Sequence, residues 1–216
     1  SSTVAVDGQA RPVSELLTYF DQRGTDHCLA IMERHPDAFE RFVERHGIPP
    51  VGSGLSLAHI LHLEHDRAGL VGDVAAYLEP MDYVGARLTG SLRATQATMF
   101  TAQVCDNRAD DRTTYDDELL AMTGLDPARL PPLLAPGEPV GTLRPDVAES
   151  LGLPRGVVVA TPMNDSHAGA LATGAFVTGQ AGVMIGTTAV LLDDVDHPGV
   201  DLDHEVLSMP SPVPGR

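Results

Sequence analysis

The sequence predicts a mixed α/β fold, and three observations support this prediction. Short apolar runs rich in β-branched residues, which are typical of strands, are interspersed with segments whose apolar residues recur at helical spacing. Glycine and proline separate these segments. Hydrophobic residues make up 43% of the 216 residues, which is enough for a folded core. This length allows one large domain, or one domain and part of a second.

The first half of the chain is predicted to be mainly helical after one short strand. Alternating residues at Val4–Val6 and a turn at Asp7-Gly8 indicate the strand and its end. Apolar residues at helical spacing, together with glycine and proline stops, then predict helices over 14–35 (with Ser14 as N-cap), 37–46, 56–66, 71–78, 82–90 and 95–104.

The second half is predicted to alternate between helices and strands. We expect helices over 115–122, 145–151 and 163–172, a short turn over 126–130, a rigid proline-rich connection over 131–139, and a strand over 141–143. Residues 157–160 form an apolar, β-branched run that suits a strand buried on both faces. Small residues over 163–172 suit a helix packed closely against a sheet, and 182–192 indicates two strands folded about 186–188.

Charge and cysteine content exclude several classes of function. All 14 basic residues are arginine and 30 residues are acidic, so the formal net charge is −16. Such a chain repels phosphate backbones and anionic lipids, so neither a nucleic acid nor a membrane is expected as a partner. Cys28 and Cys105 form no CxxC motif, no apolar run approaches the roughly 20 residues that a membrane span needs, and no signal peptide is visible, which favours the cytoplasm. Both ends of the chain look cut, and a strand is expected beyond each.

Asp165 is the first candidate for chemistry. It directly follows an expected strand and begins an expected helix, which is where open α/β sheets place their ligand sites. A carboxylate at this position can act in catalysis. The alternative interpretation is an N-cap aspartate that accepts amide hydrogen bonds from its own helix.

Three other groups of residues have a functional and a structural interpretation. Gly186, Thr187 and Thr188 could cradle phosphate oxygens, or form an ordinary tight turn. Tyr19, Asp21 and Arg23 provide an aromatic face, a carboxylate and a guanidinium, which are groups that can bind a sugar. Alternatively, they form a solvated helix surface. His59, His62 and His65 are spaced by three and suggest a metal site, but HExxH is absent and we expect none.

Several segments, taken together and in order, resemble the FGGY carbohydrate kinases, the family of glycerol kinase and xylulokinase. The resemblance covers almost the whole chain. Residues 19–23 are similar to the family's W-x-D-x-R, residues 82–90 to D-Y-L...L-T-G, residues 130–141 to L-P-x-L-x-x-P-G-x-x-V-G, the segment around Asp165 to G-D-x-x-A-A-x-G-A-G, and residues 185–188 to the S-x-G-T-S phosphate loop.

The resemblance implies the actin-like, ribonuclease H-like α/β fold. Residues 1–175 would be most of the N-terminal sugar-binding domain, without its first strands and phosphate loop, and 176–216 the beginning of the C-terminal nucleotide-binding domain. The family's D-x-G-T-x-S loop and glycine-rich adenosine site are absent, so we expect the middle of a longer kinase, inactive by itself. A homodimer is possible.

The resemblance also implies an activity, namely transfer of the ATP γ-phosphate to a hydroxyl of a sugar or polyol, with a pentulose such as xylulose as the first candidate class. Asp165 would be the base. Tyr19, Asp21, Arg23 and Asn164 would bind the sugar, and Gly186, Thr187 and Thr188 the nucleotide phosphates, with Mg²⁺.

Some residues depart from the family pattern, and two other functions stay open. Tyr19 replaces a tryptophan, Asn164 a glycine, and Ser166 a glutamine or asparagine, so the identity of the sugar is in doubt. One alternative is an inactive sugar-binding module derived from a kinase. The other is a metal hydrolase that uses His59, His62, His65 or His167.

Overall fold

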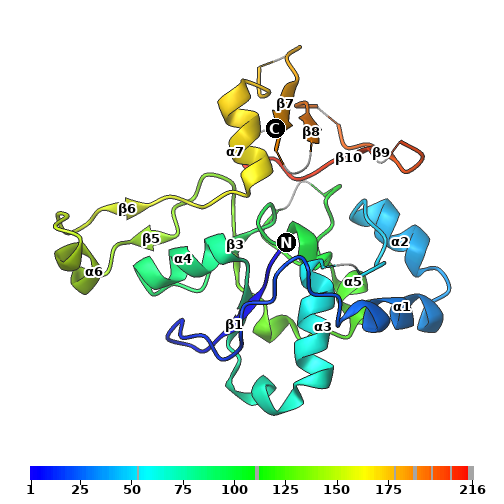
Figure 1. Ribbon diagram of the computed structural model, residues 1–216, viewed down its shortest axis with the longest axis horizontal. Coiled ribbons are helices and arrows are strands. Elements are labelled where there is room, and N and C mark those ends of the chain that lie inside the picture. The colour runs from blue at the N-terminus through cyan, green and yellow to red at the C-terminus, as the bar shows by residue number, and fades with distance from the viewer. Residues whose placement is uncertain are drawn as a thin grey trace.

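The computed structural model describes residues 1–213 except positions 53, 110, 111, 178, 187, 188, 196 and 205. It has helices and short strands, as predicted, and the described strands pair two at a time (Figure 1). The lower part contains β1 (Val4–Val6), α1 (Thr25–Arg34), α2 (Ala38–Arg45), α3 (Ser56–Asp66), η1 (Ala68–Asp73), β2 (Ala76–Leu78), α4 (Pro80–Thr89), η2 (Phe100–Ala102), α5 (Asp117–Thr123) and η3 (Pro127–Arg129).

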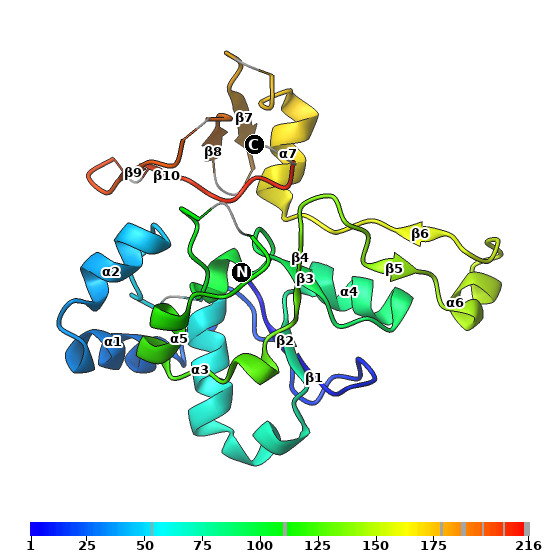
Figure 2. The same ribbon diagram turned by 180° about the vertical axis from the view of Figure 1, so that it is seen from behind.

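Two further units extend from this lower part in both views (Figures 1 and 2). An arm projects sideways and consists of β5 (Gly141–Thr142), α6 (Pro145–Ser150) and β6 (Val158–Val159), with β5 antiparallel to β6. The upper part contains α7 (Asp165–Thr173), β7 (Gly182–Ile185) and β8 (Ala189–Leu192), followed by β9 (Val200–Asp201) and β10 (Val206–Leu207). Between these units, β3 (Ala94–Thr95) pairs in parallel with β4 (Leu133–Leu134).

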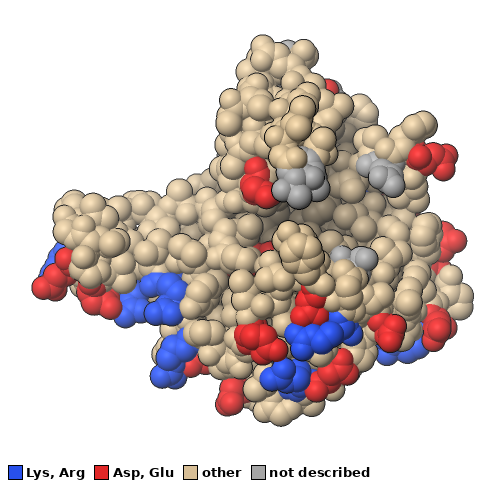
Figure 3. All heavy atoms as spheres, in the orientation of Figure 1, with Lys and Arg blue, Asp and Glu red and all other residues tan. Residues whose placement is uncertain are grey.

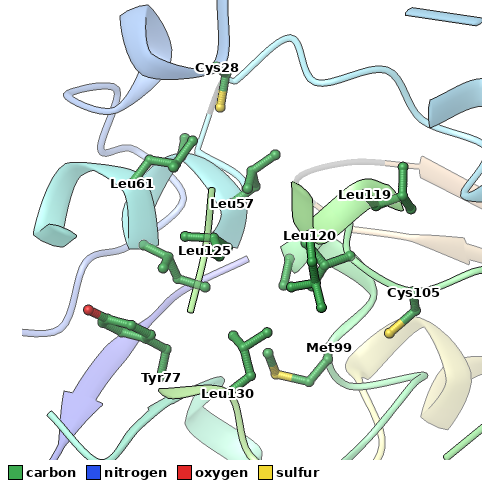
Figure 4. Packing of buried hydrophobic residues seen from close by; sticks show 14 of the residues in the cluster. Cys28, Leu57, Leu61, Tyr77, Met99, Cys105, Leu119, Leu120, Leu125 and Leu130 are labelled. Atoms are coloured by element: carbon green, nitrogen blue, oxygen red, sulfur yellow. The ribbon is translucent and has the colours of Figure 1, made fainter. Parts of the chain in front are cut away.

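The hydrophobic core lies around α3. Residues 56–63 of this helix are all buried, and the apolar ones belong to one core cluster with side chains from α1, β2, η2 and α5. Figure 4 shows Leu57 and Leu61 of α3 facing the same interior as Tyr77 and Leu119. Burying each such side chain contributes about 1.5–3 kcal/mol, so α3 is the element that organises the lower part.

The helix predicted over 14–35 is too long, and only Thr25–Arg34 is helical. Residues 12–17 instead run beside β1, where Val13 N donates to Ala5 O (2.9 Å) and Leu17 N to Thr3 O (2.9 Å). Ser14 is therefore no N-cap, because its Oγ accepts a hydrogen bond from Ala5 N (3.0 Å). Pairing with the neighbouring strand β1 overrides the local helical pattern, and residues 18–24 become a loop.

Two other helix predictions are wrong for identifiable reasons. Residues 71–78 finish η1 and then form β2, because Ala76–Leu78 pairs antiparallel with β1 and is fully buried. Residues 95–104 form β3, a turn and η2. There Thr95 N donates to Thr98 Oγ1 (3.0 Å) and Thr98 N to Thr95 Oγ1 (3.2 Å), so side chains take the amides that a helix would use.

The strand predicted at 157–160 exists as β6, but it is not buried on both faces. Val158 is 62% exposed, because the strand belongs to the two-stranded arm rather than to a central sheet. In turn, Leu133–Leu134 was expected to be part of a rigid connection and is instead a buried strand. The helices predicted over 37–46, 56–66, 82–90, 115–122, 145–151 and 163–172 are confirmed within a few residues at each end.

Candidate functional site

The loop of residues 18–24 carries the three residues predicted to contact a sugar. It begins where Thr3 and Leu17 exchange two backbone hydrogen bonds (2.8 and 2.9 Å). It ends against α3, where a Cβ at Gly24 would lie 1.8 Å from Ala58 O. A Cβ at Gly54 would lie 2.1 Å from Tyr19 O. The loop is therefore held by backbone hydrogen bonds at its first end, and at Tyr19 and Gly24 by backbone contacts that only glycine permits.

Within this loop Asp21 and Arg23 form a two-pronged ion pair. Arg23 Nη2 donates to Asp21 Oδ2 (2.6 Å) and Arg23 Nε to Asp21 Oδ1 (3.0 Å). These hydrogen bonds, opposed in part by burial, lower the pKa of Asp21 to about 2. Asp21 is thus a carboxylate at any physiological pH, and its oxygens can accept hydrogen bonds from hydroxyl groups.

Tyr19 lies on the same loop and is exposed. Its ring is next to that of Phe20, with centroids 4.1 Å apart, and Phe20 is 75% exposed. Two neighbouring exposed rings offer an apolar surface against which the C–H face of a sugar could pack. Phe20 was not predicted as a candidate, although a second aromatic residue beside Tyr19 is visible in the sequence.

Asp165 is the first residue of α7 and is exposed. The N-cap of this helix is Asn164, whose Oδ1 accepts a hydrogen bond from His167 N (2.8 Å). Asp165 Oδ1 accepts one from the adjacent Ser166 N (2.8 Å). The alternative interpretation of Asp165 as the N-cap is therefore wrong, and its carboxylate stays accessible at the start of the helix.

His167 lies two residues after Asp165 but faces the interior. Its side chain is buried, and this burial lowers its pKa to about 4. Nδ1 of His167 has no hydrogen-bond partner in the described part of the chain. His167 is consequently neutral near pH 7 and lies on the buried face of α7.

The helix α7 packs tightly on the β7–β8 hairpin, as its small residues predicted. A Cβ at Gly169 would lie 1.6 Å from Met184 Sδ, and a Cβ at Gly182 would lie 2.1 Å from Thr173 Oγ1. Gly186 follows β7 directly and is exposed. Thr187 and Thr188, the other two predicted phosphate-binding residues, lie outside the described residues.

A pocket of about 210 Å³ opens where β3 and β4 end. Its walls are residues 95–97 after β3, residues 134, 136 and 137 after β4, residues 160–163 before α7, Arg112, and residues 210–212. The carboxyl ends of parallel strands are the usual place for ligands in α/β folds. The sequence placed chemistry after residue 160, but it did not indicate that residues 95–97, Arg112 or 210–212 converge there.

The histidines proposed for a metal form a different arrangement. Asp66 Oδ2 is 2.7 Å from His62 Nδ1 and 3.0 Å from His27 Nε2, while His59 Nδ1 lies 3.2 Å from Thr3 Oγ1. Within the described part of the chain, no group of three or more His, Cys, Asp or Glu residues could hold a metal ion. Nothing in these residues supports the metal-hydrolase alternative.

The family is decided by a match over most of the chain. The model of the FGGY family of carbohydrate kinases, N-terminal domain, matches residues 1–172. The chain belongs to the FGGY family of carbohydrate kinases. Similar sequences include xylulose kinases from Streptomyces rubiginosus (32% identical over 173 residues) and Streptomyces coelicolor (31% over 175), each alignment covering 79% of this chain and 34% of the relative. This FGGY chain thus spans about a third of the length of these relatives.

Solved structures confirm the actin-like, ribonuclease H-like fold of this FGGY chain. Xylulose kinase from Rhodospirillum rubrum superposes with a TM-score of 0.86 at 22% identity, over 100% of this chain and 42% of that one. Glycerol kinase from Plasmodium falciparum superposes with a TM-score of 0.73 at 12% identity, over 88% and 37%. Because both enzymes share the fold, the fold alone does not identify the sugar. No helix in the described residues is long and apolar enough to cross a membrane.

Proposed function

We propose that the protein to which this chain belongs is an ATP-dependent carbohydrate kinase that phosphorylates a pentulose. The observation that carries this proposal is an exposed Asp165 at the start of α7, not used as its cap, in a chain of the FGGY family. The two Streptomyces relatives are both xylulose kinases, which makes a pentulose the first class to test.

In the proposed mechanism Asp165 is the general base. Its carboxylate accepts the proton of the sugar hydroxyl while that oxygen attacks the γ-phosphorus of ATP in line. Phosphoryl transfer passes through a loose transition state and needs positioning more than covalent assistance. The tight packing of α7 on β7–β8 supports this role, because it fixes the carboxylate relative to Gly186, where the phosphates would lie.

The loop of residues 18–24 would hold the sugar. Asp21 would accept hydrogen bonds from sugar hydroxyls, Arg23 would keep Asp21 ionised and oriented, and Tyr19 would pack against the C–H face. Asn164 would offer its Nδ2 group, since its Oδ1 is engaged in capping α7. The rigid anchoring of this loop favours a preformed sugar site.

The amides around Gly186, Thr187 and Thr188 would bind the phosphates of ATP. When bound, Mg²⁺ would offset the negative charge of the phosphate oxygens. This ion commonly binds through one or two carboxylates, water and substrate phosphates, so a ready-made cluster of three side chains is not required. We also propose a cytoplasmic enzyme, possibly a homodimer, whose two domains meet between residues 175 and 176.

Turnover by the full-length protein tests the proposed function. ADP release would be measured with MgATP and a panel of pentuloses, polyols and glycerol, and we expect activity on a pentulose. Saturable sugar binding without ADP release from any compound would instead support the inactive sugar-binding module. Neither binding nor release would refute both functions.

A further inference from the structure

The pocket at the ends of β3 and β4 has a combination of walls that suits a particular ligand. Leucine, methionine, alanine and several proline residues provide apolar surface, and Thr95, Thr161 and Ser211 carry hydroxyl groups. Among the described residues that line it, Arg112 is the one that carries a charge. An apolar surface with a few hydroxyls and one cation fits a small polyhydroxylated molecule that bears an anionic group.

The guanidinium of Arg112 lacks the carboxylate partner that half of the 14 arginines of this chain have among the described residues. Arg11, Arg23, Arg41, Arg45, Arg67, Arg129 and Arg144 each pair with a carboxylate. Nη1 of Arg112 is instead buried with no hydrogen-bond partner among the described residues. The Arg112 side chain is only partly buried, but a buried guanidinium nitrogen without a hydrogen-bond partner still carries a desolvation cost. An anion in the pocket would supply the missing partner.

The wall of the pocket that follows β3 is held by a hydrogen-bond network. Gln96 is buried, and its Nε2 donates to Asp106 O (2.9 Å) and to Asn107 Oδ1 (2.9 Å). Asn107 Nδ2 in turn donates to His46 O (2.8 Å). These bonds hold the segment after β3 rigidly, so the pocket does not depend on a ligand to form its shape.

The position of the pocket relates it to the proposed reaction. Pro162 and Met163 form part of its lining and lead directly into Asn164 and Asp165. A volume of about 210 Å³ could hold about seven waters at ~30 Å³ each, or a small sugar derivative. The neutral sugar that enters such a kinase becomes a dianion when it is phosphorylated, so of the two forms only the phosphorylated one carries an anionic group that could pair with Arg112.

We propose that this pocket is an anion-accepting subsite that binds the phosphate group of a phosphorylated sugar, with Arg112 as its cation and the hydroxyl groups of Thr95, Thr161 and Ser211 nearby. The proposal rests on the proposed kinase function for the source of the sugar phosphate. The shared chemistry is a phosphate dianion, which inorganic phosphate also carries. Retention of the product in this subsite would make the phosphorylated sugar an inhibitor of the enzyme.

Calorimetric titration of the full-length protein tests this subsite. Wild type, Arg112→Gln and Arg155→Gln would each be titrated with a ketopentose phosphate, with the free ketopentose and with inorganic phosphate. Arg155 is an exposed arginine that does not line the pocket, so it is the matched control. We expect Arg112→Gln to weaken binding of the sugar phosphate at least tenfold and the free sugar less than twofold, since one charge-assisted hydrogen bond is lost. Competition by inorganic phosphate would show that the phosphate group itself is bound.

Ala160→Leu keeps the proposal testable if Arg112→Gln does not fold. Ala160 is exposed and lines the pocket, so a leucine there would occupy part of its volume without disturbing the core. We expect this variant to weaken binding of the sugar phosphate as well. Unchanged affinity in either folded variant, or no binding of the sugar phosphate to wild type, overturns the proposal. Sugar-phosphate binding that depends on Arg112 in a protein without turnover would refute the kinase function and leave the subsite standing.

Discussion

At the scale of single residues, the ion pair between Asp21 and Arg23 decides the charge of the proposed sugar site. Arg23→Gln should raise the pKa of Asp21 from about 2 toward its ordinary value of 3.8, because the hydrogen bonds from the guanidinium are its largest cause. The titration of the Asp21 carboxyl in ¹³C NMR spectra measures this change. Arg11→Gln, which breaks a pair with Asp7 on another loop, should leave Asp21 as it is.

The same pair gives a signed dependence of stability on pH. Since the pKa of Asp21 is lower in the folded chain, its contribution is complete above about pH 3.8 and is lost as the pH falls toward 2. Arg23 is half-exposed, so solvent screening keeps this contribution at or below about 1 kcal/mol. An Arg23→Gln variant that unfolds in urea with unchanged pH dependence below pH 4 would contradict this account.

A second residue, His46, should make the free energy of unfolding depend on pH more strongly than Asp21 does. It is fully buried, and burial lowers its pKa from the ordinary 6.5 to about 4. As the pH falls, His46 is protonated in the unfolded chain before it is protonated in the folded one. The contribution of neutral His46 to the free energy of unfolding is therefore fully present above pH 6.5, and the free energy falls by roughly 3 kcal/mol as the pH drops to 4. His46→Gln should flatten this part of the urea-unfolding profile, whereas His204→Gln, at an exposed site, should not.

At the scale of elements, the close approach of the 18–24 loop to α3 depends on Gly24. Gly24→Ala would place its Cβ 1.8 Å from Ala58 O, so loop or helix must move. We expect the free energy of unfolding to fall by about 1–3 kcal/mol, measured by chemical denaturation. Gly8→Ala is the control, since nothing lies within 4 Å of a Cβ there. Equal stability of the two variants would mean that the loop is not anchored at this point.

The elements also show what the sequence could predict. The helix over 56–66 was predictable because its apolar spacing and the local propensity agree with its burial in the core. Residues 76–78 and 12–17 were not, since their extended shape comes from backbone pairing with β1, which the apolar spacing within each segment does not reveal. The position of Asp165 at the start of a helix was predictable from the sequence, whereas the pocket that contains Arg112 is formed by five segments whose convergence the sequence did not indicate.

At the scale of the whole molecule, charged side chains are distributed unevenly between the lower and the upper part. On the face shown in Figure 3, charged side chains gather on the lower part and along the arm, while the upper part around α7 and β7–β8 is mostly uncharged, with a hollow between them. A net charge of −16 repels ATP at long range, so the phosphates must be bound locally. Backbone amides near Gly186 are the local partners that we propose for these phosphates.

The two domains that we propose for the full-length protein predict closure around the substrates. In the full-length protein, a pentulose and a non-hydrolysable ATP analogue together should reduce the radius of gyration measured by small-angle X-ray scattering, because the domains would exclude water from the reacting phosphate. A sugar that the enzyme does not accept as a substrate, added with the same ATP analogue, should leave the radius of gyration unchanged. The same radius in the presence and absence of both ligands would contradict closure.

The most direct test of the central claim is the turnover number of Asp165→Asn in the full-length protein. If Asp165 is the base, kcat for the pentulose should fall by about 10²–10⁴-fold while KM for the sugar changes little, since asparagine keeps the shape but cannot accept the proton. Asp26→Asn, at another exposed aspartate in the first turn of a helix, should retain wild-type turnover. Wild-type kcat in Asp165→Asn would show that another group accepts the proton and would contradict the account.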